Sequence, residues 1–160
     1  MSKIQAPYIA ILWGRQRLRR QTPWQLHLRD TSYEDEIHKR IDGCYFLELA
    51  QLDESLGRLP EIYYRAQVSA EALVATIALL RYHHDKGRWP ENLERLVIEG
   101  YMRRVPMDPF SDNTLIYKPT GETFLLYSHG ADFDDDGGTP SKWGTGTKGG
   151  DQVFWPLGEN

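Results

Sequence analysis

One long apolar stretch decides the fold: Ser69-Ala-Glu-Ala-Leu-Val-Ala-Thr-Ile-Ala-Leu-Leu-Arg-Tyr-His-His-Asp-Lys-Gly87. Between Ala70 and Leu80 this stretch contains only two polar residues, Glu71 and Thr76. A helix that is apolar nearly all round is typical of a protein interior. We therefore expect a buried spine helix that starts near Ser69 and ends at Gly87, because glycine readily adopts the left-handed conformation of a helix cap.

The residues after this helix predict a second, shorter helix. Pro90 suits its first position, because the backbone N–H that proline lacks has no partner there in any case. Leu93, Leu96 and Val97 recur at helical spacing and should form its inner face. Gly100 is expected to end it.

Beyond residue 104 the pattern changes from helical to extended. The two prolines of Val105-Pro-Met-Asp-Pro-Phe110 predict a rigid bend without regular structure. β-Branched and aromatic residues predict strands at Thr114–Lys118, Thr123–Ser128 and Gln152–Trp155. Helices followed by strands indicate an α+β fold, in which the spine helix packs on a small three-stranded antiparallel sheet.

The chain divides by composition into a basic arm at residues 1–30, a helical extension at 31–62 and an α+β domain at 63–160. The arm has no sustained period and is expected to be irregular. Its run Arg15-Gln-Arg-Leu-Arg-Arg20 suits a phosphate-bearing partner, although such short basic runs are more often a solvated surface.

The helical extension is expected to begin at Thr31 or Ser32, both of which can cap a helix. Gly57 and Pro60 should end it. Its apolar residues form one stripe, at Ile37, Ile41, Cys44, Tyr45, Leu49, Leu52 and Leu56. Because Cys44 lies on this stripe, we interpret it as a small buried hydrophobe and not as a nucleophile.

The bulk composition restricts the class of protein. With 160 residues, 40% of them hydrophobic, the chain is long enough to bury a core. Its single cysteine excludes an internal disulfide. No segment reaches the ~20 apolar residues that a membrane-spanning helix needs. The residues from Met1 to Ala10 lack the charged-then-apolar layout of a secretory signal.

The most informative motif is the acidic loop Asp132-Phe-Asp134-Asp-Asp136-Gly137-Gly138. Aspartates at alternate positions followed by glycine open the calcium loops of EF-hands. Calcium takes six to eight oxygen ligands, and alternate side chains can converge on it when the backbone curls round the ion. Gly137 permits the sharp turn, and the carbonyl of Gly138 can add a further oxygen. We therefore predict that Asp132, Asp134 and Asp136 bind Ca²⁺.

The loop departs from an EF-hand, however. Its twelfth position holds Trp143 in place of the bidentate glutamate, and no helices flank it. A further carboxylate is expected from Asp151, just before the last strand. Two alternatives remain: a solvated acidic turn without an ion, and a magnesium site, which is disfavoured because magnesium keeps most of its waters.

Several motifs in the same order resemble the soluble part of a type II secretion pseudopilin. The segment Leu79–Pro90 is similar to that family's long helix leading into an "Asn-Gly-x-Tyr/Trp-Pro" turn, and Asp108-Pro-Phe110 to its "Asp-Pro-Trp/Phe" bend. Tyr127-Ser-His-Gly-Ala-Asp132 resembles its "Tyr-Ser-Leu-Gly-Ala-Asp". Gly137-Gly138 is similar to its Gly-Gly position, and Asp151-Gln-Val to its "Asp-Ile" position. The resemblance covers about residues 65–156.

This resemblance implies a calcium ion in the loop between the last two strands. Carried over by position, Asp132 and Asp151 are side-chain ligands, and the carbonyl of His129 or Ser128 is another. The family begins with a leader and a membrane-spanning helix, where this sequence has the basic arm and the helical extension. We therefore expect either a domain cut from a larger membrane protein or a soluble derivative, of a kind met in planctomycete-type proteins with an unrelated front end.

These observations favour a non-catalytic, calcium-stabilised structural or assembly domain that works through protein partners or self-association. The alternative is a module that binds an anionic partner, nucleic acid or a membrane surface, through the basic arm; nucleic acid is disfavoured because no recognition helix accompanies it. An enzyme is not expected, because Ser128 and His129 are strand neighbours that face opposite ways and cannot easily form a relay with Asp132. No small-molecule substrate is expected. If the chain belongs to an exported protein, we expect it in an extracytoplasmic compartment such as the periplasm.

Overall fold

The computed structural model describes residues 21–32, 35–36, 59–141 and 149–156. The chain divides between Tyr64 and Arg65 into two units. The first unit contains a short helix, α2 (Pro23–His27), within the arm that was expected to be irregular. The side chain of Thr22 caps this helix by accepting a hydrogen bond from the Gln25 N–H at 3.2 Å.

Ser32 is the residue that caps the start of the predicted helical extension. Its Oγ accepts from the Asp35 N–H at 3.0 Å, and Asp35 Oδ2 in turn accepts from the Ser32 N–H at 2.8 Å. This reciprocal pair is the arrangement of a capping box. The rest of the extension, including Cys44 and its apolar stripe, lies outside the described residues, as does the Arg15–Arg20 run.

Helix α5 (Leu59–Lys86) is the long helix predicted from the sequence, but it begins ten residues before Ser69. Pro60 was expected to end the preceding helix, and instead it lies in the first turn of α5. Proline is tolerated there because the first N–H groups of a helix have no partner within it. The end is as predicted: Gly87 has a φ of +68°, and its N–H donates to the His83 carbonyl at 2.8 Å.

The prediction that α5 is buried all round was wrong. The residues of its inward face are fully or almost fully buried: Val68, Ala72, Ala75, Leu79 and Tyr82. On the opposite face, large apolar side chains are exposed: Leu73, Val74, Ile77 and Leu80. The reason is architectural, since a domain of two layers covers only one side of a helix.

Helix α6 (Leu93–Ile98) is the predicted short helix, and it buries Leu93 and Leu96. It starts three residues after Pro90, because the side chain of Asn92 caps it by accepting from the Arg95 N–H at 3.0 Å. Gly100 ends it with a φ of +78°, as predicted.

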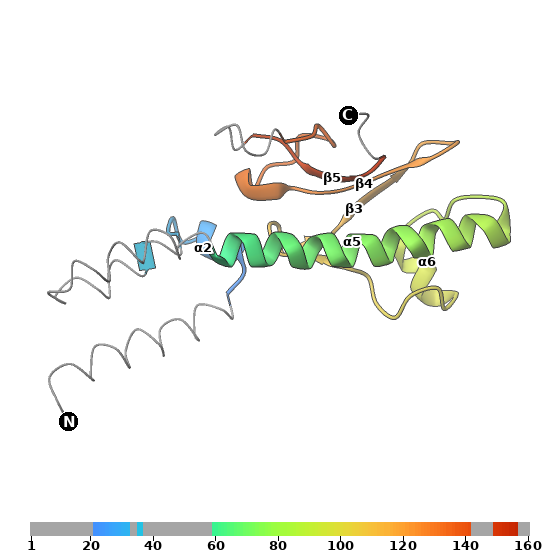
Figure 1. Cartoon of the computed structure of the whole chain (residues 1–160), viewed down its shortest axis with the longest axis horizontal. Helices are drawn as coiled ribbons and strands as arrows, with labels where there is room; N and C mark the ends of the chain where they lie inside the picture. Colours follow the sequence, from blue (N-terminus) through green and yellow to red (C-terminus); the bar gives the residue numbers. More distant parts are fainter. Residues whose placement is uncertain (1–20, 33–34, 37–58, 142–148, 157–160) are drawn as a thin grey trace, which may run out of the picture. The chain divides into compact units, whose positions relative to one another are not determined.

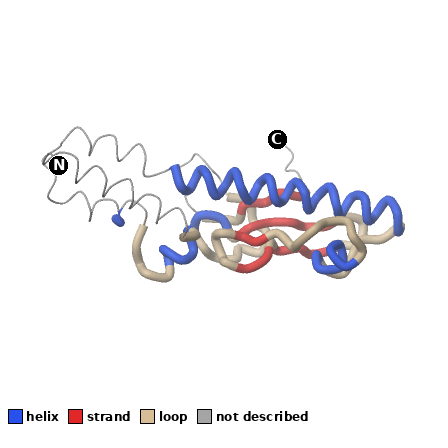
Figure 2. The backbone as a smooth tube through the Cα atoms, turned by 90° about the horizontal axis from the view of Figure 1, so that it is seen from below, coloured by secondary structure: helices blue, strands red, loops and turns tan. Residues whose placement is uncertain are grey.

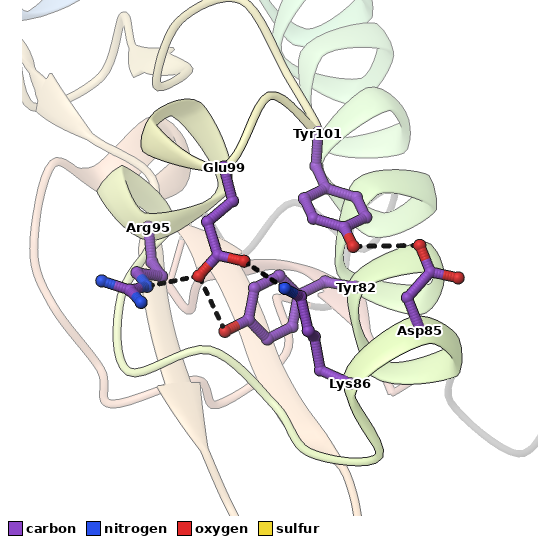
Figure 3. A network of polar contacts seen from close by, with 6 residues as sticks. All are labelled: Tyr82, Asp85, Lys86, Arg95, Glu99 and Tyr101. Atoms are coloured by element: carbon purple, nitrogen blue, oxygen red, sulfur yellow. Dashed lines mark hydrogen bonds and ion pairs between the residues drawn. The ribbon is translucent and has the colours of Figure 1, made fainter.

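A network of polar contacts ties α6 to the end of α5 (Figure 3). The Glu99 carboxylate contacts Lys86 Nζ at 2.8 Å and Arg95 Nε at 2.6 Å. Beside this carboxylate, the Tyr101 hydroxyl donates to Asp85 Oδ2 at 2.9 Å. The hydrogen bond from Lys86 is the main reason why the pKa of Glu99 lies below its ordinary value. The network therefore fixes the turn between the two helices through ionised groups.

The bend after α6 contains a small hairpin of two-residue strands, β1 (Met107–Asp108) and β2 (Asn113–Thr114), where no regular structure was expected. Pro106 and Pro109 flank β1 and do not have to donate within its short ladder. Asp108 is almost fully buried although its side chain is a carboxylate.

Three strands form the predicted antiparallel sheet in the order β3 (Ile116–Pro119), β4 (Phe124–Ser128) and β5 (Gln152–Trp155). Helix α5 runs along one face of this sheet in both views (Figures 1 and 2). Successive residues of β4 alternate between its faces. Phe124 and Leu126 lie on the face with the core aromatics, where the Phe124 ring stacks on Trp155 at 5.3 Å. The fold of the second unit is α+β, as predicted.

Within the described ranges, no helix combines the length and the apolar character required to cross a membrane.

Candidate metal centre

The acidic loop connects β4 to β5 and returns beside the start of β5. After β4, a turn of 3-10 helix, η1 (Gly130–Asp132), leads into it. Residues 139–141 then lie parallel to Asp151: the Asp151 N–H donates to the Thr139 carbonyl at 2.7 Å, and the Ser141 N–H donates to the Asp151 carbonyl at 2.9 Å. The chain therefore brings both sides of the loop against Asp151 before β5 begins.

Two glycines permit this close approach. Gly150 has a φ of +105°, and a Cβ atom there would lie 2.8 Å from both Cα and N of Ser141. Gly138 has a φ of +91°, and a Cβ atom would lie 2.6 Å from Leu125 Cδ2 on the outer face of β4. Gly137, to which the sequence assigned the sharp turn, has a φ of +68° and open space around it.

Asp151 is the most unusual carboxylate of the loop. The residue is completely buried. Its Oδ2 accepts from the Gly138 N–H at 2.7 Å, whereas its Oδ1 is buried and has no hydrogen-bond partner. Burial raises the pKa of Asp151, although the backbone N–H groups of Gly138 and Asp136 oppose this. An ionised carboxylate in this position has an uncompensated oxygen, which is the condition that a bound cation relieves.

Asp132 forms the complementary contact on the other side of the loop. Its Oδ2 accepts from the Gly150 N–H at 2.6 Å, and its Oδ1 is 3.5 Å from the Asp134 N. The Asp132 carboxylate thus binds the backbone beside Asp151, at Gly150. The Asp151 carboxylate in turn binds the backbone of the acidic loop, at Gly138. The two carboxylates that the sequence placed at one site do lie on the two sides of the same loop closure.

The other aspartates of the loop do not have the arrangement of a calcium loop, in which alternate side chains converge on the ion. Asp134 and Asp136 are exposed, and Asp134 Oδ1 accepts from the Asp135 N–H at 3.0 Å. Asp135, which the alternation left out, is the one tied to the sheet: its Oδ1 accepts from the Tyr127 hydroxyl at 2.8 Å. This hydrogen bond is the main reason why the pKa of Asp135 lies below its ordinary value. The sequence contained one indication of the Tyr127–Asp135 contact: Tyr127 alternates along β4 with residues of the core face, which places it on the other face of the sheet.

The backbone of His129 is held by Asp108, for which the sequence predicted only a place in a bend. The His129 N–H donates to Asp108 Oδ2 at 3.1 Å, and the Ser128 hydroxyl donates to Asp108 Oδ1 at 2.8 Å. The imidazole Nδ1 is buried without a hydrogen-bond partner. The hydroxyl of Ser128 is therefore engaged with Asp108 and not with its neighbour His129.

Among the described residues, no three side chains of the His, Cys, Asp and Glu types come together as a group that could hold a metal ion. Calcium also takes backbone carbonyl and water oxygens, so a site with two carboxylates is compatible with its chemistry. The fit of this loop to calcium therefore depends on Asp151 and its partnerless Oδ1, supported by Asp132. Of the two adjacent histidines near the end of α5, His84 is exposed and His83 stacks on Trp89 at 4.1 Å.

Comparison of the chain with protein-family models, with curated proteins and with solved structures finds no match.

Proposed function

We propose that this chain is a non-catalytic structural or assembly domain of the pseudopilin-like kind, stabilised by calcium and related to type II secretion. The order of elements supports the proposal: a long helix, a short helix, a bend and a three-stranded sheet with an acidic loop between its last two strands. The single observation that carries the calcium part is the fully buried Asp151 carboxylate, whose Oδ1 has no hydrogen-bond partner.

Calcium at this loop has a structural role in the proposal. Asp151 precedes β5 and Asp132 follows β4, so an ion bound by both links the two strands at their ends. His129, Asp134 and Asp136 are further candidate ligands, through a backbone carbonyl for His129 and through side chains for the two aspartates. Without the ion, the charge on Asp151 destabilises the folded state, because its pKa is raised by burial.

The test is a thermal melt of the full chain in calcium, in magnesium and in chelator. At one hundred times its dissociation constant, a ligand that binds only the folded state adds ~2.7 kcal/mol to the free energy of unfolding. We expect calcium to raise the melting temperature and magnesium to have a much smaller effect. Asp151→Asn should abolish the calcium response, and Asp132→Ala should weaken it.

Glu122→Gln is the matched control, because Glu122 is an exposed carboxylate in the turn between β3 and β4. Its calcium response should equal that of the unmodified chain. A melting temperature that does not change with calcium, or a response that persists in Asp151→Asn, would contradict the metal site.

A further inference from the structure

The acidic loop contacts the outer face of β4, which carries Leu125 and Tyr127. Gly138 lies so close to this face that a Cβ atom on it would come within 2.6 Å of Leu125 Cδ2. Asp135 reaches the same face by accepting a hydrogen bond from the Tyr127 hydroxyl at 2.8 Å. Tyr127 is completely buried although it lies outside the core face. The loop is therefore seated on the sheet at two neighbouring side chains of one strand.

The Tyr127 hydroxyl connects the sheet to the loop with a defined direction of hydrogen bonding. Lys118 Nζ lies 2.7 Å from the hydroxyl oxygen and 5.1 Å from the centroid of the ring. An ammonium group can only donate, so the hydroxyl accepts from Lys118. Its own proton is then available to the Asp135 carboxylate, which can only accept when it is ionised. Lys118 thus directs the Tyr127 proton towards Asp135.

The same Asp135 oxygen fixes the turn that leads to Asp151. Asp135 Oδ1 also accepts from the Gly137 N–H at 3.0 Å. The next N–H, that of Gly138, donates to Asp151 Oδ2 at 2.7 Å. Two consecutive N–H groups therefore connect the Tyr127–Asp135 pair to the buried carboxylate with the partnerless Oδ1. A Cβ atom on Gly137 would meet nothing within 4 Å, so the turn depends on these hydrogen bonds and not on packing at Gly137.

We propose that Tyr127 is a positioning residue of the calcium site, because through Asp135 it holds the turn whose next N–H binds Asp151. This inference rests on the calcium site proposed above, and it adds a residue that does not touch the ion. A site that is formed only part of the time binds with an affinity reduced by that fraction. Loss of the Tyr127 hydroxyl therefore weakens calcium binding without removing a ligand.

The experiment is a calorimetric titration of the full chain with calcium at about 0.15 M salt, where charges more than about 8 Å apart are largely screened. We expect Tyr127→Phe and Asp135→Ala each to raise the dissociation constant about tenfold, the scale of one lost hydrogen bond to a charged group. Asp135→Asn should raise it by less than about threefold, because the amide oxygen can still accept from Tyr127 and Gly137.

Tyr117→Phe is the matched control, because the Tyr117 hydroxyl lies on the neighbouring strand and donates to the Pro90 carbonyl at 2.9 Å, away from the loop. It should leave the dissociation constant unchanged. A thermal melt in chelator verifies that each variant folds. Asp135→Ala changes an exposed side chain, so it carries the test if Tyr127→Phe does not fold.

The outcomes separate this inference from the metal site itself. An unmodified chain that does not bind calcium overturns both. Calcium binding that the folded variants Tyr127→Phe or Asp135→Ala leave unchanged overturns only the positioning role. An Asp135→Asn variant that binds as weakly as Asp135→Ala shows that Asp135 acts through its charge, as a calcium ligand would, and also overturns the positioning role.

Discussion

At the scale of single residues, Asp108 organises the region between the bend and the end of β4. Its carboxylate is 1% exposed and accepts four hydrogen bonds. The donors are the Phe110 N–H, the Ser111 hydroxyl, the Ser128 hydroxyl and the His129 N–H, at 2.8 to 3.2 Å. A buried charge is stable only when its lone pairs are satisfied in this way.

We predict that Asp108→Ala lowers the free energy of unfolding by about 3 kcal/mol or more, because it leaves several buried donors without an acceptor. Ser111→Ala removes one of the same hydrogen bonds and should cost about 1 kcal/mol. Urea denaturation measures both, with an unchanged slope as the sign that only stability has changed. Equal effects of the two substitutions would show that Asp108 does not hold these donors together.

At the scale of elements, the joint between α5 and α6 depends on ionised side chains. The Glu99 carboxylate forms ion pairs with Lys86 and Arg95. The Tyr82 hydroxyl also lies 3.5 Å from its Oε1. The pKa of Glu99 is lowered in the folded state, first by the hydrogen bond from Lys86. Its contribution to stability is therefore present above the ordinary pKa of glutamate and is lost as the pH falls through the lowered value.

We predict that Glu99→Gln lowers the melting temperature by a few degrees at most near neutral pH, since such partly exposed pairs contribute little each. The difference from the unmodified chain should shrink with added salt, and it should disappear in acid as the pH falls from the ordinary glutamate pKa of about 4.3 through the lowered value. Melts over a range of pH and salt measure this. Glu122→Gln, which removes an exposed carboxylate from the turn between β3 and β4, is the control, and a pH-independent difference would refute the prediction.

Helix α5 has one buried and one exposed apolar face within the described residues. One face contributes Val68, Ala72 and Leu79 to the core, while Leu73 and Ile77 on the other remain exposed. A purely structural helix of a two-layer domain would carry polar residues on its outer face. The packing of the described residues therefore does not account for the apolar side chains on the outer face of α5.

At the scale of the whole molecule, the chain consists of two units that meet in sequence at Tyr64 and Arg65. The second unit has a core of its own. The largest fully buried apolar side chains of the described residues all belong to this unit: Leu79, Tyr82, Leu96, Phe110, Phe124, Leu126 and Tyr127. A unit that buries such a core can fold by itself.

We predict that a fragment beginning at Leu59, the first residue of α5, unfolds in one cooperative transition. Its melting temperature should lie within about 5 °C of that of the second unit in the full chain, which corresponds to about 1 kcal/mol for a domain of this size. Calorimetry of the fragment and the full chain compares them. A fragment without a cooperative transition would show that the second unit depends on residues before Leu59.

The sequence by itself determined the order of α5, α6 and the three strands of the larger sheet, and several of their ends, but not the β1–β2 hairpin. Gly87 and Gly100 end their helices, and β3, β4 and β5 lie where alternation predicted them within two residues. These features depend on local chemistry: a glycine permits a positive φ wherever it stands, and side-chain period follows from backbone geometry.

Only the tertiary structure decided which groups meet. It exposed one face of α5, because the sheet covers a single side, and it tied Asp135 rather than Asp134 or Asp136 to Tyr127. It also buried Asp151 with one oxygen lacking a partner. The sequence could name Asp151 as a candidate ligand, but burial and hydrogen bonding arise from segments distant in the chain, and no local pattern contains them.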